Sequence, residues 1–192
     1  MVIYVDMDNT LCDTYKAIES YANEYYDLGI TIYRERLFRN RTIPILVNCG
    51  TSEKLANEIR NSIGNDLDYW AERIQIAEGA RDIMRFLCKN HQVHIATSTF
   101  LIEGFACMNG KVLWLKKNLP FYNIKNTIYT NFKYNLIGDM LIDDVSVQVE
   151  GFRGRKIIRD FPYNRGYTGC DVRFNEWTDE NFVEFITSLQ KN

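Results

Sequence analysis

The chain has 192 residues, of which 46% are hydrophobic and 25% are charged, with 23 Lys and Arg against 25 Asp and Glu. This composition is typical of a folded domain and excludes collagen-like and disordered chains. The near balance of charge gives no electrostatic reason for binding polymeric nucleic acid or an anionic membrane surface.

Five short apolar runs predict buried strands that alternate with helical or turn-rich stretches, a pattern typical of a parallel sheet. The runs cover residues 2–5, 92–97, 127–130, 140–143 and 156–158. Apolar spacing, acidic first turns and a terminating proline predict helices beside this sheet at residues 79–90, 111–119 and 179–190.

Residues 15–77 follow a different pattern. Helices are predicted at 15–26 and 51–63, and no convincing buried strand lies between them. We therefore predict an α/β protein in which residues 1–14 and 78–192 form a Rossmann-like, three-layer core with a parallel sheet. A small helical cap is inserted into this core at residues 15–77.

The sequence also predicts where the protein resides. No apolar run approaches the length of a membrane-spanning helix, and Asp6 interrupts the apolar start of the chain before a signal peptide could form. The five cysteines include no C-x-x-C pair, which fits reduced thiols. We expect a cytoplasmic protein that does not bind membranes.

Two acidic motifs follow predicted strands. Asp6 and Asp8 lie in the pentad Asp-Met-Asp-Asn-Thr after the first strand, and Asp143 and Asp144 follow the apolar residues 140–142. Because the carboxyl ends of parallel strands share the edge where ligands bind, these carboxylates should meet there. Their repulsion calls for protons or a hard cation, and oxygen ligands without His or Cys favour Mg²⁺.

Polar side chains at two further positions suit a phosphoryl group. Thr97 and Ser98 close the second strand, and Lys133 lies between the third and fourth strands. A hydroxyl donates a hydrogen bond to a phosphoryl oxygen, and an ammonium neutralises its charge. Each residue alone also fits a strand cap or a solvated lysine, but the order of the four motifs favours a phosphate site.

In this order the motifs resemble those of the haloacid dehalogenase-like (HAD) phosphatases, and within that superfamily the sequence is most similar to the 5'(3')-deoxyribonucleotidases. The closer resemblance rests on Ala-Thr-Ser at 96–98, Gly-Lys-Val-Leu-Trp at 110–114, Leu-Ile-Asp-Asp at 141–144 and Phe-Pro-Tyr-Asn-Arg at 161–165. It covers the core nearly end to end and is thin in the cap. Asn9 stands where those nucleotidases often carry Gly.

The resemblance implies a mechanism with an aspartyl-phosphate intermediate. Asp6 would attack phosphorus, and Asp8 would protonate the leaving oxygen and later accept a proton from the attacking water. Mg²⁺ would be bound by Asp6, by the backbone carbonyl of Asp8 and by the second acidic pair. Either Asp143 or Asp144 could be the direct ligand.

The resemblance also implies which residues hold the phosphoryl oxygens. Thr97 or Ser98 matches the family's second motif and Lys133 its third, both of which bind phosphate, and Lys111 matches a family lysine near the phosphate. These donors would spread the negative charge that develops on the phosphoryl group.

The cap should select the substrate, because the catalytic edge would contact only the phosphoryl group. Arginines and aromatic residues that could contact a nucleotide are Arg34, Arg36, Arg39, Arg41, Tyr25, Tyr26, Tyr33, Phe38, Tyr69 and Trp70. A solvated basic face over an ordinary cap core also fits these residues, and the sequence singles out no base-stacking side chain.

Together these features predict a Mg²⁺-dependent phosphomonoesterase that hydrolyses deoxyribonucleoside monophosphates. One alternative is a phosphatase of another small ester, such as a sugar phosphate, which the same catalytic residues would serve. A second is a non-catalytic module that binds a phospho-ligand. The expected partner is a small phosphate ester; a homodimer is compatible with such an enzyme, although no stripe of residues argues for one.

Overall fold

The computed structural model describes residues 1–38, 41–99 and 104–189. These residues form one six-stranded sheet with the order β3-β2-β1-β4-β5-β6, in which every neighbouring pair is parallel. The strands are β1 (Val2–Val5), β2 (Gln92–Thr97), β3 (Thr127–Tyr129), β4 (Met140–Asp143), β5 (Arg155–Arg159) and β6 (Val172–Phe174). This is the strand order of the Rossmann fold, and it confirms the predicted fold class.

Side chains alternate between the two faces of the sheet, and helices cover both faces. Tyr4 belongs to an apolar cluster on one face, against which α6 (Ser146–Glu150) packs. Its neighbour Val5 belongs to the main apolar cluster on the opposite face, which α4 (Ala80–Asn90) and α7 (Glu180–Ser188) cover. The core therefore has the predicted three layers.

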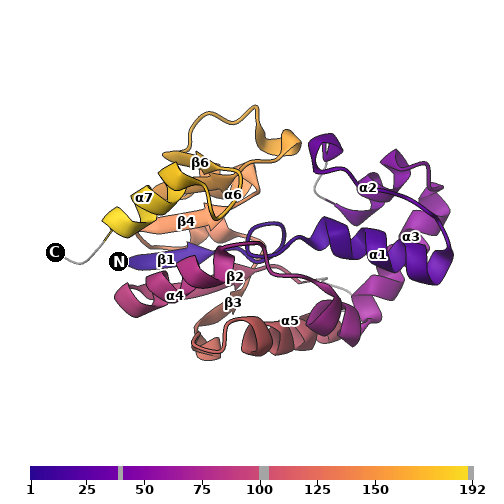
Figure 1. Ribbon diagram of the computed structural model, residues 1–192, viewed down its shortest axis with the longest axis horizontal. Coiled ribbons are helices and arrows are strands. Elements are labelled where there is room, and N and C mark those ends of the chain that lie inside the picture. The colour runs from indigo at the N-terminus through magenta and orange to yellow at the C-terminus, as the bar shows by residue number, and fades with distance from the viewer. Residues whose placement is uncertain (39–40, 100–103, 190–192) are drawn as a thin grey trace.

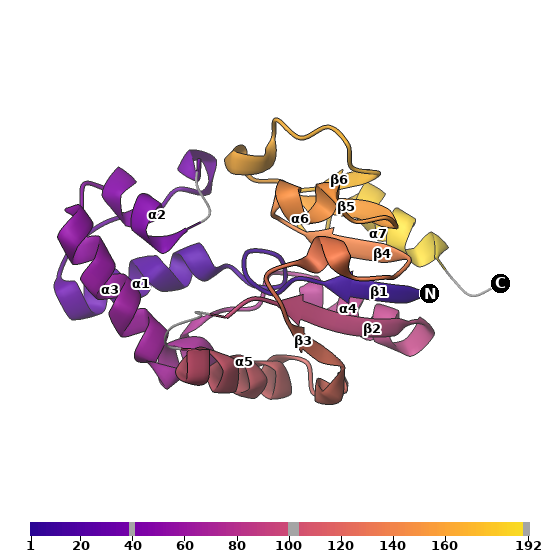
Figure 2. The same cartoon turned by 180° about the vertical axis from the view of Figure 1, so that it is seen from behind.

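The chain between β1 and α4 contains helices and no strand among its described residues. These helices are α1 (Thr14–Tyr26), the 3-10 turn η1 (Arg34–Arg36), α2 (Thr42–Asn48), α3 (Glu53–Asn65) and the π-helical turn η2 (Tyr69–Arg73). We call residues 14–73 the helical segment. It lies beyond the carboxyl ends of the strands, at the end of the molecule away from both termini (Figure 1, and from behind in Figure 2).

The helical segment contacts the rest of the chain on both sides of the sheet edge. On one side, η2 packs against α5 (Gly104–Asn118), where a Cβ on Gly110 would lie 2.3 Å from the Cβ of Trp70. On the other side, η1 contacts the 3-10 turn η5 (Pro162–Asn164). The carboxyl edge of the sheet therefore lies between the contact of η2 with α5 and the contact of η1 with η5.

Short or irregular elements differ from the sequence prediction. The sequence does not predict α2, α6 or β6, because elements of three to seven residues are too short to show a clear period. The helix predicted at 111–119 begins earlier, at Gly104. Glycine on its own disfavours a helix, but the close packing of Gly110 against η2 stabilises the helix at this point. No helix in the described ranges is long and apolar enough to cross a bilayer.

The two remaining 3-10 turns lie on either side of β3. They are η3 (Ile124–Asn126) and η4 (Lys133–Asn135), and η4 packs against α6. Through η4 the chain brings Lys133 to the carboxyl edge of the sheet.

Candidate active site

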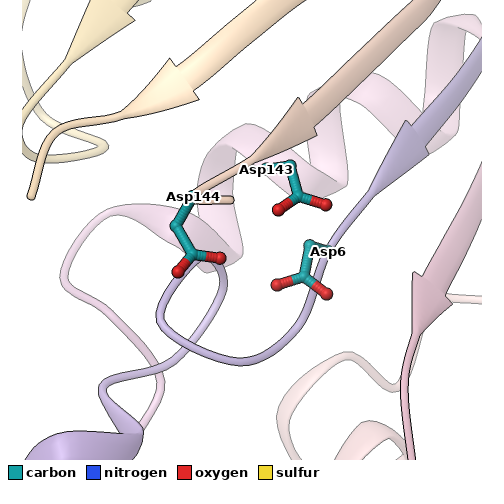
Figure 3. Close-up of side chains that lie close together, drawn as sticks. All are labelled: Asp6, Asp143 and Asp144. Atoms are coloured by element: carbon teal, nitrogen blue, oxygen red, sulfur yellow. The ribbon is translucent and has the colours of Figure 1, made fainter. Parts of the chain in front are cut away.

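The acidic residues of the two predicted motifs meet at the carboxyl ends of β1 and β4. The register pairs Val5 with Ile142, and the Asp6 amide donates to the Ile142 carbonyl at 2.8 Å. Asp6, Asp143 and Asp144 are buried, and each offers a carboxylate oxygen within 4.8 Å of the others (Figure 3). The chain crosses over in opposite directions from β1 and β4, which is the point where ligands bind in such sheets.

Burial sets the electrostatics of these acids. Burial raises the pKa of Asp6 to about 7, and although Lys133 opposes this rise, Asp143 adds to it. Burial also raises the pKa of Asp144 well above its usual range, with further contributions from Asp143 and Asp6. A bound cation would relieve the repulsion that these shifts record.

Lys133 places its ammonium group between two of the acids. Its Nζ donates to Asp6 Oδ1 at 2.5 Å and to Asp143 Oδ2 at 2.7 Å, and its side chain is 6% exposed. Burial disfavours the ammonium, but Asp143 and Asp6 outweigh this effect and raise the pKa of Lys133. The lysine is therefore charged and fixed beside the predicted nucleophile.

Hydroxyl and amide donors fix the second acidic pair. Thr10 Oγ1 donates to Asp144 Oδ1 at 3.3 Å, and the Tyr163 hydroxyl donates to Asp144 Oδ2 at 2.5 Å. The Val145 amide donates to Asp143 Oδ1 at 2.8 Å. Thr10 and Tyr163 lie within the predicted motifs, but their roles cannot be predicted from the sequence, since a hydroxyl far along the chain from its acid leaves no spacing signal.

A second group of predicted residues surrounds Asp8. Lys111 Nζ donates to Asp8 Oδ2 at 2.5 Å, to Thr97 Oγ1 at 2.8 Å and to the Ser98 carbonyl at 2.7 Å. It lies 5.2 Å from the centroid of the Trp70 ring. Burial disfavours this ammonium too, but Asp8 outweighs burial and raises the pKa of Lys111.

The residues present fit a hard divalent cation. The candidate donors are carboxylate oxygens, which suit Mg²⁺ better than they suit soft metals. Asp6, Asp143 and Asp144 are therefore residues that could hold such an ion.

All the predicted site residues thus lie at one edge of the sheet, in two groups joined by the loop from Asp6 to Asp8. They are Asp6, Asp8, Thr97, Ser98, Lys111, Lys133, Asp143 and Asp144. Within the second group, the backbone carbonyl of Ser98 contacts Lys111.

Asn9, where the sequence departs from the family pattern, has a backbone conformation that explains both residue types. Its φ is +55°, in the left-handed region where Gly is unstrained and Asn is the commonest substitute. Its Oδ1 accepts a hydrogen bond from Thr14 Oγ1 at 2.6 Å.

The predicted arginines of the helical segment lie in different environments. Arg34 forms an ion pair with Glu176 and donates to the carbonyls of Asp160 and Asn175 at 3.0 and 2.8 Å. Arg36 is exposed, as is Arg41. Arg39 lies outside the described residues. Arg34 therefore binds the core rather than solvent.

The predicted aromatic residues also divide. Tyr69 and Trp70 are buried, and Trp70 Nε1 donates to the Ile63 carbonyl at 2.8 Å. Tyr25, Tyr33 and Phe38 are exposed, and Tyr26 is half-buried. Two cavities of about 420 and 510 Å³ lie on the helical segment, but the four acids of the candidate site line neither of them. Trp70 is connected to the predicted phosphate site through Lys111.

A Rossmann-like sheet with paired acids after adjacent strands and a buried lysine between them defines the HAD-like class of hydrolases. Solved structures support this class at the level of the fold. The haloacid dehalogenase-like family hydrolase SP0104 from Streptococcus pneumoniae matches with a TM-score of 0.58 and 15% identity, over 98% of each chain. The magnesium-bound YfnB from Bacillus subtilis matches with a TM-score of 0.56 and 13% identity, over 96% of this chain and 97% of that one.

Within this class, the chain belongs to the family described as 5' nucleotidase, deoxy (pyrimidine), cytosolic type C protein (NT5C), whose model matches residues 1–190. It is 29% identical to the 5'(3')-deoxyribonucleotidase of Bacillus subtilis (strain 168) over 179 residues, which is 93% of this chain and 95% of that protein. The 5'(3')-deoxyribonucleotidase of Bacillus phage SPbeta matches to the same extent. Family membership confirms the predicted resemblance and the prediction of a phosphoric monoester hydrolase of the nucleotidase type.

Proposed function

We propose that this protein removes phosphate from deoxyribonucleoside monophosphates in a Mg²⁺-dependent reaction. The observation that carries the proposal is the group of three buried carboxylates within 4.8 Å of one another, with Lys133 bound to two of them. Deoxyribonucleotides are the substrates named for the relatives that match most of this chain. The family model points to the same class.

In the proposed reaction, Asp6 is the nucleophile and Asp8 the acid and base. An Asp6 carboxylate oxygen bonds to phosphorus while the ester oxygen leaves and takes a proton from Asp8. Asp8 then accepts a proton from the water that attacks phosphorus, which releases phosphate and regenerates the Asp6 carboxylate. We assign this proton to Oδ1 of Asp8, which is buried and has no hydrogen-bond partner in the part of the chain that the structure describes, because Oδ2 is bound to Lys111.

The remaining residues bind and neutralise. Lys111 and Thr97 would hold the phosphoryl oxygens on the Asp8 side, with Ser98 beside them, and Lys133 would do so on the Asp6 side. Lys111, Thr97 and Lys133 are buried, so their contacts are stronger than they would be at an exposed surface.

Asp6, the Asp8 carbonyl and the acidic pair would hold Mg²⁺. The acidic pair is Asp143 and Asp144, of which Asp143 is bound to Lys133 and Asp144 to two hydroxyls. When bound, the ion supplies positive charge that offsets the charge developing on the phosphoryl oxygens.

We also propose that residues 15–77 act as a cap that selects the substrate. The helical segment lies opposite the sheet edge (Figure 1). Its buried Trp70 ring lies against Lys111. A nucleoside extending from a phosphate at Lys111 would therefore meet this segment first.

The test is phosphate release by the purified protein with Mg²⁺ across deoxy- and ribonucleoside 5'- and 3'-monophosphates and a set of sugar phosphates. We expect preference for deoxyribonucleotides, with activity abolished by a chelator and restored by added Mg²⁺. Activity confined to sugar phosphates would keep the mechanism and overturn the substrate class. Absence of Mg²⁺-dependent activity on every compound would overturn the proposal.

A further inference from the structure

Strand β5 ends in a buried arginine that the proposed reaction does not use. Arg159 is 0% exposed. Its Nη1 donates to the carbonyls of Asn9 and Thr10 at 3.2 and 3.3 Å, and to Asp13 Oδ1 at 2.9 Å. Its Nη2 donates to Glu176 Oε2 at 2.9 Å. One guanidinium group thus binds three residues of the loop that carries Asp6 and Asp8.

In that loop, residues 6–13, several backbone amides bond to a carbonyl of the loop itself. The amides of residues 10–12 all donate to the Met7 carbonyl, at distances of 2.9–3.3 Å. With these amides bonded within the loop, two of the loop's carbonyls face Arg159 instead. Buried carbonyls need donors, and Arg159 supplies one to each of these two, while the Thr10 carbonyl also accepts from Trp177 Nε1 at 2.8 Å.

One residue of the loop is in a conformation that needs support. Asn9 has a φ of +55°, which L-residues other than Gly adopt at a cost. Thr14 binds its side chain and Arg159 binds its carbonyl. Because Asn9 directly follows Asp8, any relaxation of Asn9 would move the Asp8 carboxylate.

The charge of Arg159 is compensated at both ends of the guanidinium. Burial disfavours the charged form, but Asp13 and Glu176 outweigh burial and raise the pKa of Arg159. The planar guanidinium donates several hydrogen bonds in a fixed fork, which a lysine ammonium on its flexible stem cannot reproduce.

We propose that Arg159 is a positioning residue for phosphoryl transfer: its guanidinium holds the carbonyls of Asn9 and Thr10 and so keeps Asp6 and Asp8 in reactive geometry. This inference rests on the proposed function. Arg159 is hydrogen-bonded to the loop and not to the carboxylates of the candidate site. We therefore expect its loss to slow the chemical step rather than to weaken substrate binding.

The direct test is Arg159→Lys, which keeps the charge beside Asp13 and Glu176 but loses the fork. We expect kcat to fall about 10- to 100-fold while KM stays within about twofold, because small misplacement of reacting groups slows the chemical step without changing uniform binding. Steady-state kinetics and the single-turnover rate on the best substrate measure this split. A folded variant with kcat within about twofold of the wild type, or with its loss in KM alone, would overturn the proposal.

A matched control is Arg73→Lys in the helical segment. Arg73 also binds several groups, donating to Ser20 Oγ and Glu24 Oε2 at 2.8 Å each, but among the described residues it forms no hydrogen bond or ion pair with the loop. We expect its kcat to stay within about twofold of the wild type. A loss equal to that of Arg159→Lys would show that the effect is not specific to the loop, and would overturn the proposal.

A second pair of variants decides the matter if Arg159→Lys does not fold, as its thermal melt would show. Glu176→Gln and Arg34→Gln both remove the Arg34–Glu176 ion pair, but Glu176→Gln also weakens the hold on Arg159. We expect kcat of Glu176→Gln to be about threefold or more below that of Arg34→Gln. Equal values would overturn the proposal, whereas an inactive wild type would overturn the proposed function instead.

Discussion

The carboxyl edge of the sheet and the helical segment differ in how closely their residues follow from the sequence. At the sheet edge, charged residues that follow adjacent strands lie close together because the strands end side by side. Asp6 and Asp143 are both in contact with Lys133. In the helical segment, an arginine can face solvent or a neighbouring element. Arg36 faces solvent while Arg34 crosses to the core, two residues away along the same turn.

The difference teaches that sheet topology brings the predicted catalytic residues together, whereas packing decides which residues of the helical segment contact the core. A parallel sheet brings strand ends to one edge whatever the connections between them. Helices allow many orientations for the same residue types, so aromatic and basic composition alone predicts no contact. The following predictions test each side of this contrast.

The largest expected effect is at the predicted nucleophile. Asp6→Asn should lower kcat/KM by about 10⁴-fold or more, because the neutral amide cannot attack phosphorus. Phosphate release on the best substrate measures it. Glu58→Gln, an exposed acid on α3, is the control and should leave the rate unchanged. Substantial turnover by Asp6→Asn would contradict the assigned role.

The next largest effect is at the second buried lysine. Lys111→Met should lower kcat/KM by about 100- to 1000-fold, because it removes a buried charge aimed at the phosphoryl group and leaves Asp8 without its ion pair. Lys116→Met, on an exposed position of the same helix, is the matched control. If both variants kept wild-type kinetics in folded protein, the phosphate site would lie elsewhere.

Metal binding should stabilise the fold, because the buried acids repel one another without it. At Mg²⁺ about 100-fold above its dissociation constant, the free energy of unfolding should rise by about 2.7 kcal/mol. For a chain of this size this raises Tm by roughly 5–10 °C. Thermal melts with Mg²⁺ and with a chelator measure the shift, and Asp6→Asn should reduce it. An equal shift in Asp6→Asn and wild type would place the ion away from these carboxylates.

The smallest effect is expected where the helical segment meets the core. Arg34→Gln should raise KM by about threefold to tenfold with little change in kcat, because it removes an ion pair that seats this segment over the site. Arg36→Gln lies in the same turn, removes the same charge and should be neutral. Equal effects of the two substitutions would mean that KM depends on the charge of this turn and not on the ion pair between Arg34 and Glu176.

Much of the core could be predicted because its signals are local. Each of β1, β2 and β4 is a short apolar run ending in polar residues, and the motif order implied which ends would meet. The residues that hold the site could not be predicted in this way. Tyr163 and Arg159 act on partners 19 and about 150 residues away, at Asp144 and Asn9, and no periodicity records such contacts.

The short elements escaped prediction for a related reason. Strand β6 has three residues with Arg173 at its centre, and this arginine binds Asp160 and the Tyr167 carbonyl rather than facing solvent. A charged residue in the middle of so short a strand hides its apolar pattern. Tertiary contacts, and not local propensity, form this edge of the sheet.

The central claim is that Asp6 is phosphorylated during turnover, and mass spectrometry of an acid-quenched reaction tests it most directly. Asp8→Asn with p-nitrophenyl phosphate and Mg²⁺ is the best case, because this leaving group needs no proton while hydrolysis of the intermediate still needs Asp8 as a base. We predict a phosphoryl group that accumulates on Asp6. A phosphoryl group on another residue, or turnover of this variant with Asp6 unmodified at every quench time, would contradict the account.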